Sequence, residues 1–165
     1  MSAVHERPPG RMSPAVLIAT WFGLGLLRPG PGTWGTLGAM VLGLIWQLSG
    51  PPAALPWGFI GATVLCTGLG LWSCAPASRH FGREDPGAVV IDEVAGFFLG
   101  MSVIGPGHAA RWHSALVVFA LFRAFDIFKP WPISRLEKLP GSWGVMSDDL
   151  AAGLVAGLLT LVLPF

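Results

Sequence analysis

Residues 89–100 have the sequence VVIDEVAGFFLG, in which two adjacent acidic residues interrupt an apolar run. A carboxylate at bilayer depth costs about 2.5–3.5 kcal/mol even on the lenient insertion scale. Asp92 and Glu93 could be ordinary charges at a helix start near an interface, because a helix N-terminus favours anions. They could also serve metal or proton chemistry. The small residues Ala95 and Gly96 favour this second interpretation, since they would let a neighbouring helix approach.

The composition indicates that this run does enter a membrane. The chain has 165 residues, of which 53% are hydrophobic and only 12% charged, against about 25% charged in a typical soluble domain. The mean hydropathy is +0.64. A net charge of +1 gives no support for nucleic-acid binding. We predict an all-α polytopic membrane helix bundle, with a polar tail over residues 1–13 and a single membrane-embedded domain over residues 14–165.

The apolar segments predict about five membrane helices and one shorter element. Residues 14–27 are too few to span a membrane, which takes about 20 residues. They predict a short re-entrant or interfacial helix. The five longer apolar segments are residues 36–49, 56–75, 89–105, 113–128 and 147–165.

The loops between these segments differ in positive charge, which predicts an orientation. Loops 28–35, 76–88 and 129–146 carry most of the cations, whereas loops 50–55 and 106–112 carry one arginine. We therefore expect the first group to face the cytoplasm. The cations of that group are Arg28, Arg79, Arg83, Lys129, Arg135 and Lys138.

Three more acidic residues lie near the predicted cytoplasmic ends of their apolar segments. Asp126 ends one segment, and Asp148 and Asp149 begin another. Each could be an ordinary interfacial charge. If the acids converge, however, oxygen ligands suit a hard cation such as Mg²⁺ and leave positions open for a phosphate. The candidate metal ligands are Asp92, Glu93, Asp126, Asp148 and Asp149.

Basic residues accompany these acids. Arg123 and Asp126 are three apart on one helix face, so they could form an ion pair. Alternatively, the planar guanidinium of Arg123 could bind a phosphate in a bidentate manner. Residues 28–38, RPGPGTWGTLG, could be an ordinary turn or could present N–H groups to an anion. The candidate phosphate ligands are Arg123, Lys129, Thr33, Gly35 and Thr36.

The motifs of several common phosphatases are absent. Cys74 is not followed by arginine at the Cys-x5-Arg spacing, and no D-x-D-x-[TV], P-S-G-H or D-G-x2-A-R sequence occurs. Cys66 and Cys74 would lie about 12 Å apart along a helix, beyond the reach of a disulfide. We expect both cysteines to be packing residues.

Four stretches together resemble the phosphatidylglycerophosphatase A family, in the family's order and over residues 28–153. Residues 141–146 are GSWGVM where the family usually has G-G-x-G-I-M, a mild departure. The four stretches are PGPGTWGTL at 29–37, VIDEVAG at 90–96, FRAFDIFKPWPI at 122–133 and GVMSDDLAAG at 144–153.

The resemblance implies a Mg²⁺-dependent phosphatase that removes the terminal phosphate of phosphatidylglycerophosphate. It implies a multi-pass protein of the bacterial cytoplasmic (inner) membrane, with its site facing the cytoplasm. Asp126, Asp149 and Arg123 are then the candidate catalytic residues. The attacking group is either a carboxylate, with Asp126 as the candidate, or a water activated by the metal.

Two other classes of function compete with this interpretation. A divalent-cation channel or transporter also uses intramembrane acids, but it would place them through the membrane depth rather than toward one face. A non-catalytic membrane subunit would leave the acidic residues without a purpose.

Overall fold

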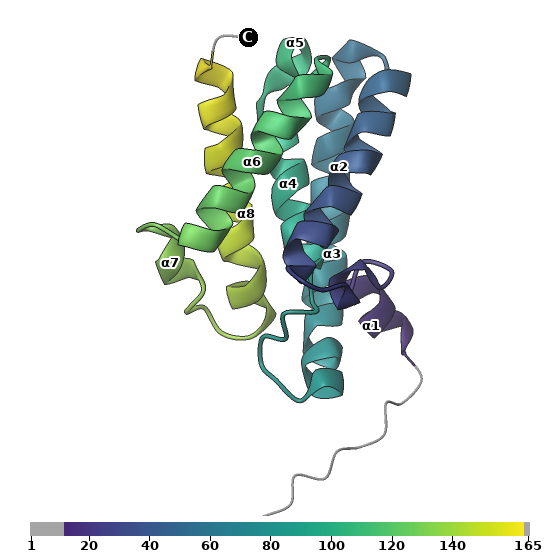
Figure 1. The fold of residues 1–165 in the computed structure, drawn as a ribbon, viewed down its shortest axis with the longest axis vertical. Helices are drawn as coiled ribbons and strands as arrows, with labels where there is room; N and C mark the ends of the chain where they lie inside the picture. Colours follow the sequence, from purple (N-terminus) through teal and green to yellow (C-terminus); the bar gives the residue numbers. More distant parts are fainter. Residues whose placement is uncertain (1–11, 164–165) are drawn as a thin grey trace, which may run out of the picture.

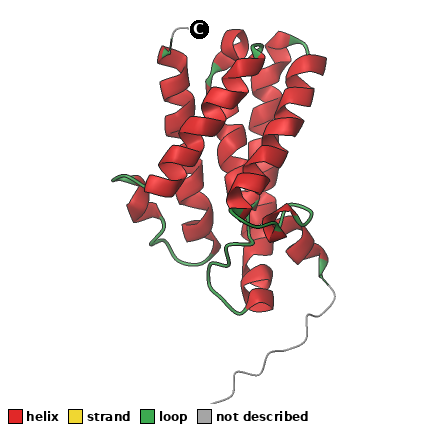
Figure 2. Ribbon diagram, in the orientation of Figure 1, coloured by secondary structure: helices red, strands yellow, loops and turns green. Residues whose placement is uncertain are grey.

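Helices make up the regular structure of the protein. The computed structural model describes residues 12–163, and no strand occurs among them (Figure 2). The all-α prediction is confirmed, while residues 1–11 of the predicted polar tail lie outside the described residues. The long helices are α2 (Pro31–Ser49), α3 (Leu55–Phe81), α4 (Ile91–Val103), α6 (Trp112–Phe128) and α8 (Ser142–Val162). The short ones are α1 (Pro14–Ala19), η1 (Leu24–Leu26), η2 (Pro52–Ala54), α5 (Gly105–Ala109) and α7 (Ile133–Leu136).

The long helices alternate in direction along the chain (Figure 1). The loops that precede α2, join α3 to α4 and join α6 to α8 therefore gather at one end, drawn at the bottom of Figure 1 and called the lower end below. The loops between α2 and α3 and between α4 and α6 lie at the opposite end. The two ends therefore hold the same two groups of loops that were predicted from their different numbers of positive charges.

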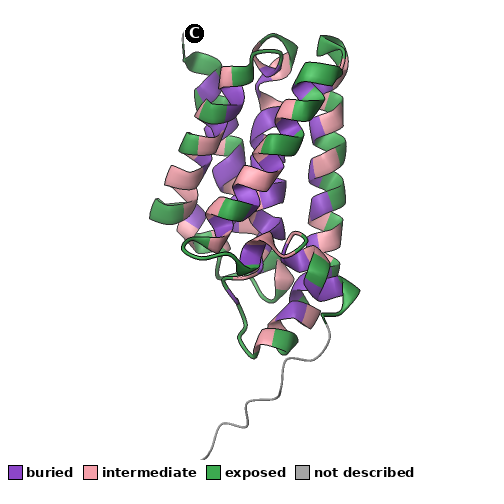
Figure 3. Cartoon of the chain, turned by 45° about the vertical axis from the view of Figure 1, so that its right-hand side comes forward, coloured by how far each residue is buried: buried purple, intermediate pink, exposed green. Residues whose placement is uncertain are grey.

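Helix α4 forms the centre of the bundle. It packs against α2, α3, α6 and α8, and buried ribbon, drawn in purple, lies at the centre of the bundle (Figure 3). Ile91, Val94, Phe97 and Met101 of this helix have no exposed surface. A helix that is covered on every side needs no polar face, which explains its apolar sequence.

Glycines allow α4 and α8 to approach at backbone distance. A Cβ atom on Gly153 would collide with the carbonyl oxygen of Gly96, and one on Gly157 would lie 2.6 Å from that of Gly100. A Cβ on Gly96 would lie 2.5 Å from the carbonyl oxygen of Asp149. The close helix approach predicted at Gly96 is therefore present, and it places the starts of α4 and α8 side by side.

Among residues 12–163, two helical stretches are long and apolar enough to cross a membrane, η2 together with α3 (Pro52–Phe81) and α8 (Ser142–Val162). Helix α4 has 13 residues and α6 has 17, fewer than the roughly 20 that a span needs. The bundle has the five predicted helices, but the prediction that about five of them are membrane helices is not confirmed. The apolar sequence of α4 reflects burial inside the protein, which a hydropathy count cannot distinguish from contact with lipid.

The segment 14–27 is not one short helix. Helix α1 starts with Ser13 as its cap, whose Oγ accepts a hydrogen bond from the Val16 N–H at 3.3 Å. Positive φ angles at Trp21 and Phe22 then break the helix before η1. The segment lies at the lower end, with α1 against α3 and η1 against α2 (Figure 1).

Candidate active site

All five predicted acidic ligands line one cavity at the lower end. The cavity has a volume of about 770 Å³. Asp92 and Glu93 stand in the first turn of α4, and Asp126 stands in the last turn of α6. Asp148 and Asp149 belong to α8, which begins at Ser142. The alternating helix directions therefore bring acids from three helices to one end of the bundle.

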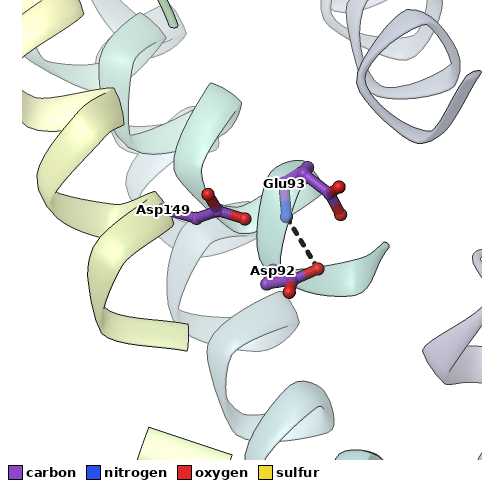
Figure 4. A group of neighbouring side chains, drawn as sticks. All are labelled: Asp92, Glu93 and Asp149. Carbon is purple, nitrogen blue, oxygen red and sulfur yellow. Dashed lines mark hydrogen bonds between the residues drawn. The ribbon is translucent and has the colours of Figure 1, made fainter. Parts of the chain in front are cut away.

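Three of these carboxylates form a compact group. Asp92, Glu93 and Asp149 each offer an oxygen, and the three oxygens lie within 4.8 Å of one another. Figure 4 shows Asp149 on α8 facing the pair on α4, with the Glu93 N–H donating to Asp92 Oδ1 at 3.1 Å. Asp92 is 7% exposed and Asp149 is 4% exposed.

Arg123 and Lys129 each bind acids of the site. Arg123 Nη1 donates to Asp126 Oδ2 at 2.5 Å and lies 3.8 Å from Glu93 Oε1. The ion pair considered for Arg123 and Asp126 is thus present. Lys129 Nζ donates to Asp148 Oδ2 at 2.6 Å. Both cations hold acids in place in the structure, whether or not they also bind a substrate.

The environment of Lys129 keeps its side chain charged. Burial alone lowers the pKa of Lys129, but the hydrogen bond to Asp148 and the nearby charges of Asp148 and Glu137 raise it, and the net pKa is above the usual value. Lys129 Nζ lies 3.7 Å from Glu137 Oε1. An ammonium group therefore stands at the cavity throughout the physiological pH range.

The acids outnumber the cations that could balance them. Within residues 12–163, Asp92 and Asp149 have no cationic partner, and the buried atoms Glu93 Oε2 and Asp148 Oδ1 have no hydrogen-bond partner. Uncompensated buried carboxylates are strongly unfavourable. A hard divalent cation with oxygen ligands would neutralise them. The residues present therefore fit a metal ion, with Asp92, Glu93 and Asp149 as its first candidates.

The structure does not place the predicted phosphate loop at this cavity. Thr33, Gly35 and Thr36 are absent from its lining. Thr36 is fully buried, and its hydroxyl donates to the Gly32 carbonyl at 2.8 Å. A Cβ on Gly35 would lie 2.7 Å from the Val90 side chain. Gly35 and Thr36 therefore serve the packing of α2, and glycine-rich sequence alone does not distinguish this from phosphate binding.

Thr36→Val should leave the phosphate release that the family resemblance implies within about threefold of wild type, because the lost hydroxyl bonds only to its own helix. The measurement is initial phosphate release beside a thermal unfolding curve. A hundredfold loss of rate in a variant that unfolds normally would instead place this hydroxyl at the substrate.

The cavity also has polar lining residues that no sequence motif marks as site residues. Glu84, Asp85 and Lys138 line it from loops, and only the polar composition of those loops pointed to them. Cys74 also contributes to the wall. Both Cys66 and Cys74 are buried free thiols, as predicted.

The chain matches the family model described as phosphatidylglycerophosphatase A over residues 17–164. A Haemophilus influenzae protein named phosphatidylglycerophosphatase A is 37% identical over 156 residues, which cover 93% of this chain and 91% of that protein. An Escherichia coli K12 protein of the same name is 33% identical over 155 residues, with 91% and 84% covered. A Bacteroides thetaiotaomicron protein named as a candidate phosphatidylinositol-3-phosphatase is 36% identical over 147 residues, with 89% and 91% covered. No solved structure gives a significant match. The chain is therefore an enzyme, a phosphatase, and it belongs to the phosphatidylglycerophosphatase A family.

Proposed function

We propose that this enzyme hydrolyses the terminal phosphomonoester of phosphatidylglycerophosphate to give phosphatidylglycerol and phosphate, with Mg²⁺ as its cofactor. The observation that carries the proposal is the convergence of Asp92, Glu93 and Asp149 in a cavity that also holds Lys129. The names of the Haemophilus influenzae and Escherichia coli relatives supply the substrate.

We further propose that residues 14–165 form one multi-pass domain in the bacterial cytoplasmic membrane, with the lower end at the cytoplasmic face. Large apolar side chains are exposed on α2 and α3. Soluble monomers rarely expose extensive apolar patches, and the arginines and lysines of the lower loops favour a cytoplasmic position. The exposed side chains include Val41, Ile45, Val64, Leu65 and Trp72.

Asp92, Glu93 and Asp149 would hold the metal, and Asp126 and Asp148, which line the same cavity, are proposed as additional ligands. When bound, the ion supplies positive charge that polarises the phosphoryl group and orients it. The protein's part is to keep these carboxylates in position, which the ion pairs of Asp126 and Asp148 do.

Arg123 and Lys129 would bind the oxygens of the phosphomonoester, because charge-assisted hydrogen bonds are well suited to phosphate. To do so they would exchange part of their contact with Asp126 and Asp148 for contact with the substrate. The first turn of α2 adjoins Arg123, since a Cβ on Gly32 would lie 2.9 Å from Arg123 Nη1. Thr33, in the same turn, does not line the cavity and is proposed as a donor only for a phosphate held at Arg123.

The reaction breaks the bond between phosphorus and the glycerol oxygen, which leaves with a proton, while water supplies the new hydroxyl of phosphate. Asp126 lines the cavity beside Arg123 and has two possible tasks. Its carboxylate can attack phosphorus and later be released by water, or it can accept the proton of an attacking water. Acid quenching during a single turnover of substrate with a radiolabelled terminal phosphate distinguishes the two tasks, because attack by Asp126 leaves labelled phosphate on the protein, whereas direct water attack labels only free phosphate.

A cation channel or transporter fits the structure less well. Every acidic residue within residues 12–163 lines the lower cavity, so none marks a path through the depth of the bundle. These residues are Glu84, Asp85, Asp92, Glu93, Asp126, Glu137, Asp148 and Asp149.

The deciding experiment uses the purified full chain in detergent micelles with phosphatidylglycerophosphate. We expect phosphate release that EDTA lowers at least about a hundredfold, since a catalytic metal supplies several kcal/mol, and that Mg²⁺ restores. Phosphatidylinositol 3-phosphate should be tested in parallel because of the Bacteroides thetaiotaomicron relative. No release from phosphatidylglycerophosphate with Mg²⁺ present would exclude the proposed function, and full activity in EDTA would exclude the metal.

A further inference from the structure

The cavity has a buried floor and an exposed rim. Asp92 and Asp149 of the floor are buried, whereas Glu84, Asp85 and Lys138 of the lining are exposed. The rim residues come from the loop between α3 and α4 and from the segment between α7 and α8. A ligand longer than a phosphate group would therefore contact different residues at its two ends.

The two lysines that line this cavity differ in their partners. Lys129 is held by Asp148 at 2.6 Å and by Glu137 at 3.7 Å. Lys138 forms no ion pair with any residue in the described part of the chain. Since the rest of the charged rim is acidic, Lys138 is the lining cation with its charge available to an anion from outside.

Packing fixes the backbone on both sides of Lys138. The carbonyl oxygen of Glu137 would lie 2.9 Å from a Cβ on Gly144, and that of Leu139 lies closer still. The Leu139 N–H also donates to the Leu136 carbonyl at 3.0 Å. The segment therefore rests against the first turn of α8, and the position of Lys138 at the rim is built into the fold.

The substrate of the proposed function carries two phosphates, a terminal monoester and a diester, separated by a three-carbon glycerol. With the monoester at the acidic floor, the diester lies further out, toward the rim. Glu84 and Asp85 would repel it there, whereas an unpaired ammonium would attract it. We propose that Lys138 binds the phosphodiester and thereby makes the enzyme prefer phosphatidylglycerophosphate to lipids with a monoester alone. This inference rests on the proposed function and adds a residue for substrate selection.

The test compares Lys138→Ala and Lys138→Arg in neutral detergent micelles. An exposed ion pair contributes up to about 1 kcal/mol, which corresponds to about fivefold in affinity. Lys138→Ala should therefore raise KM for phosphatidylglycerophosphate about fivefold and leave kcat unchanged. Lys138→Arg should restore KM. Inhibition by phosphatidylglycerol, which keeps the diester, should weaken by a similar factor, while inhibition by inorganic phosphate should not change.

Phosphatidate, which has a monoester and no diester, provides the substrate control. Its KM, or its inhibition constant if it is not hydrolysed, should be the same for Lys138→Ala and wild type. Arg135→Ala provides the protein control, because this exposed cation is close in sequence, contacts the Trp131 ring at 5.7 Å and does not line the cavity. It should leave every constant near the wild-type value.

Equal changes for phosphatidate and phosphatidylglycerophosphate, or an equal effect of Arg135→Ala, would show a general surface charge effect and overturn the inference. So would an unchanged KM in an otherwise active Lys138→Ala enzyme, with the proposed function left intact. A wild-type protein that does not hydrolyse phosphatidylglycerophosphate would overturn both.

Discussion

Asp149→Asn should lower phosphate release at least about a hundredfold, since even the outer partners of metal ligands cost 10–100-fold when they are mutated. The asparagine side chain would keep the shape of the aspartate but lose the negative charge that Asp149 contributes to the group with Asp92 and Glu93. The measurement is the initial rate at saturating Mg²⁺, followed by a Mg²⁺ titration. We expect weaker Mg²⁺ activation together with the lower rate.

A second readout separates loss of metal binding from misfolding. In EDTA, Asp149→Asn should unfold at a higher temperature than wild type, because it removes one of several buried like charges. Added Mg²⁺ should stabilise wild type by mass action and stabilise the variant much less. Asp85→Asn, an exposed acid outside the three-carboxylate group, should retain activity within about threefold. A wild-type rate for Asp149→Asn would remove this residue from the site.

Gly153→Ala should destabilise the protein by about 3 kcal/mol, the upper part of the range for overpacking a core. The added methyl would collide with the backbone of Gly96, which cannot turn aside as a side chain can. Helices α4 and α8 must then separate. Because these helices carry Asp92, Glu93 and Asp149, phosphate release should fall as well.

Gly68→Ala is the matched control. Gly68 is an exposed glycine of α3, and a Cβ there would meet nothing within 4 Å. Alanine is favoured over glycine in a helix by about 1 kcal/mol, so this variant should be as stable as wild type or slightly more stable. Unfolding followed by tryptophan fluorescence in detergent measures both variants. Equal midpoints for Gly153→Ala and Gly68→Ala would contradict the close helix contact.

Much of the candidate site could be predicted from the sequence because helices have simple geometry. Asp92 and Asp149 stand near the N-terminal ends of their apolar segments and Asp126 stands near the C-terminal end of the segment between them. Because these three segments alternate in direction, the acids gather at one end of the bundle. The spacing of Arg123 and Asp126 similarly predicted their contact. Thr36 shows the opposite case, since its role depends on whether the hydroxyl points to a cavity or to its own helix, and the sequence carries no information on that direction.

The sequence by itself determined an all-helical bundle, the two groups of loops and the acids that meet at one end, because periodicity and charge act locally along the chain. Only the tertiary structure decided which acids form the compact group, since this depends on the backbone contact between Gly96 and Gly153. It also showed that α4, the helix that carries Asp92 and Glu93, is a buried core helix of 13 residues. Hydropathy alone could not show this, because a helix surrounded by protein and a helix surrounded by lipid are equally apolar.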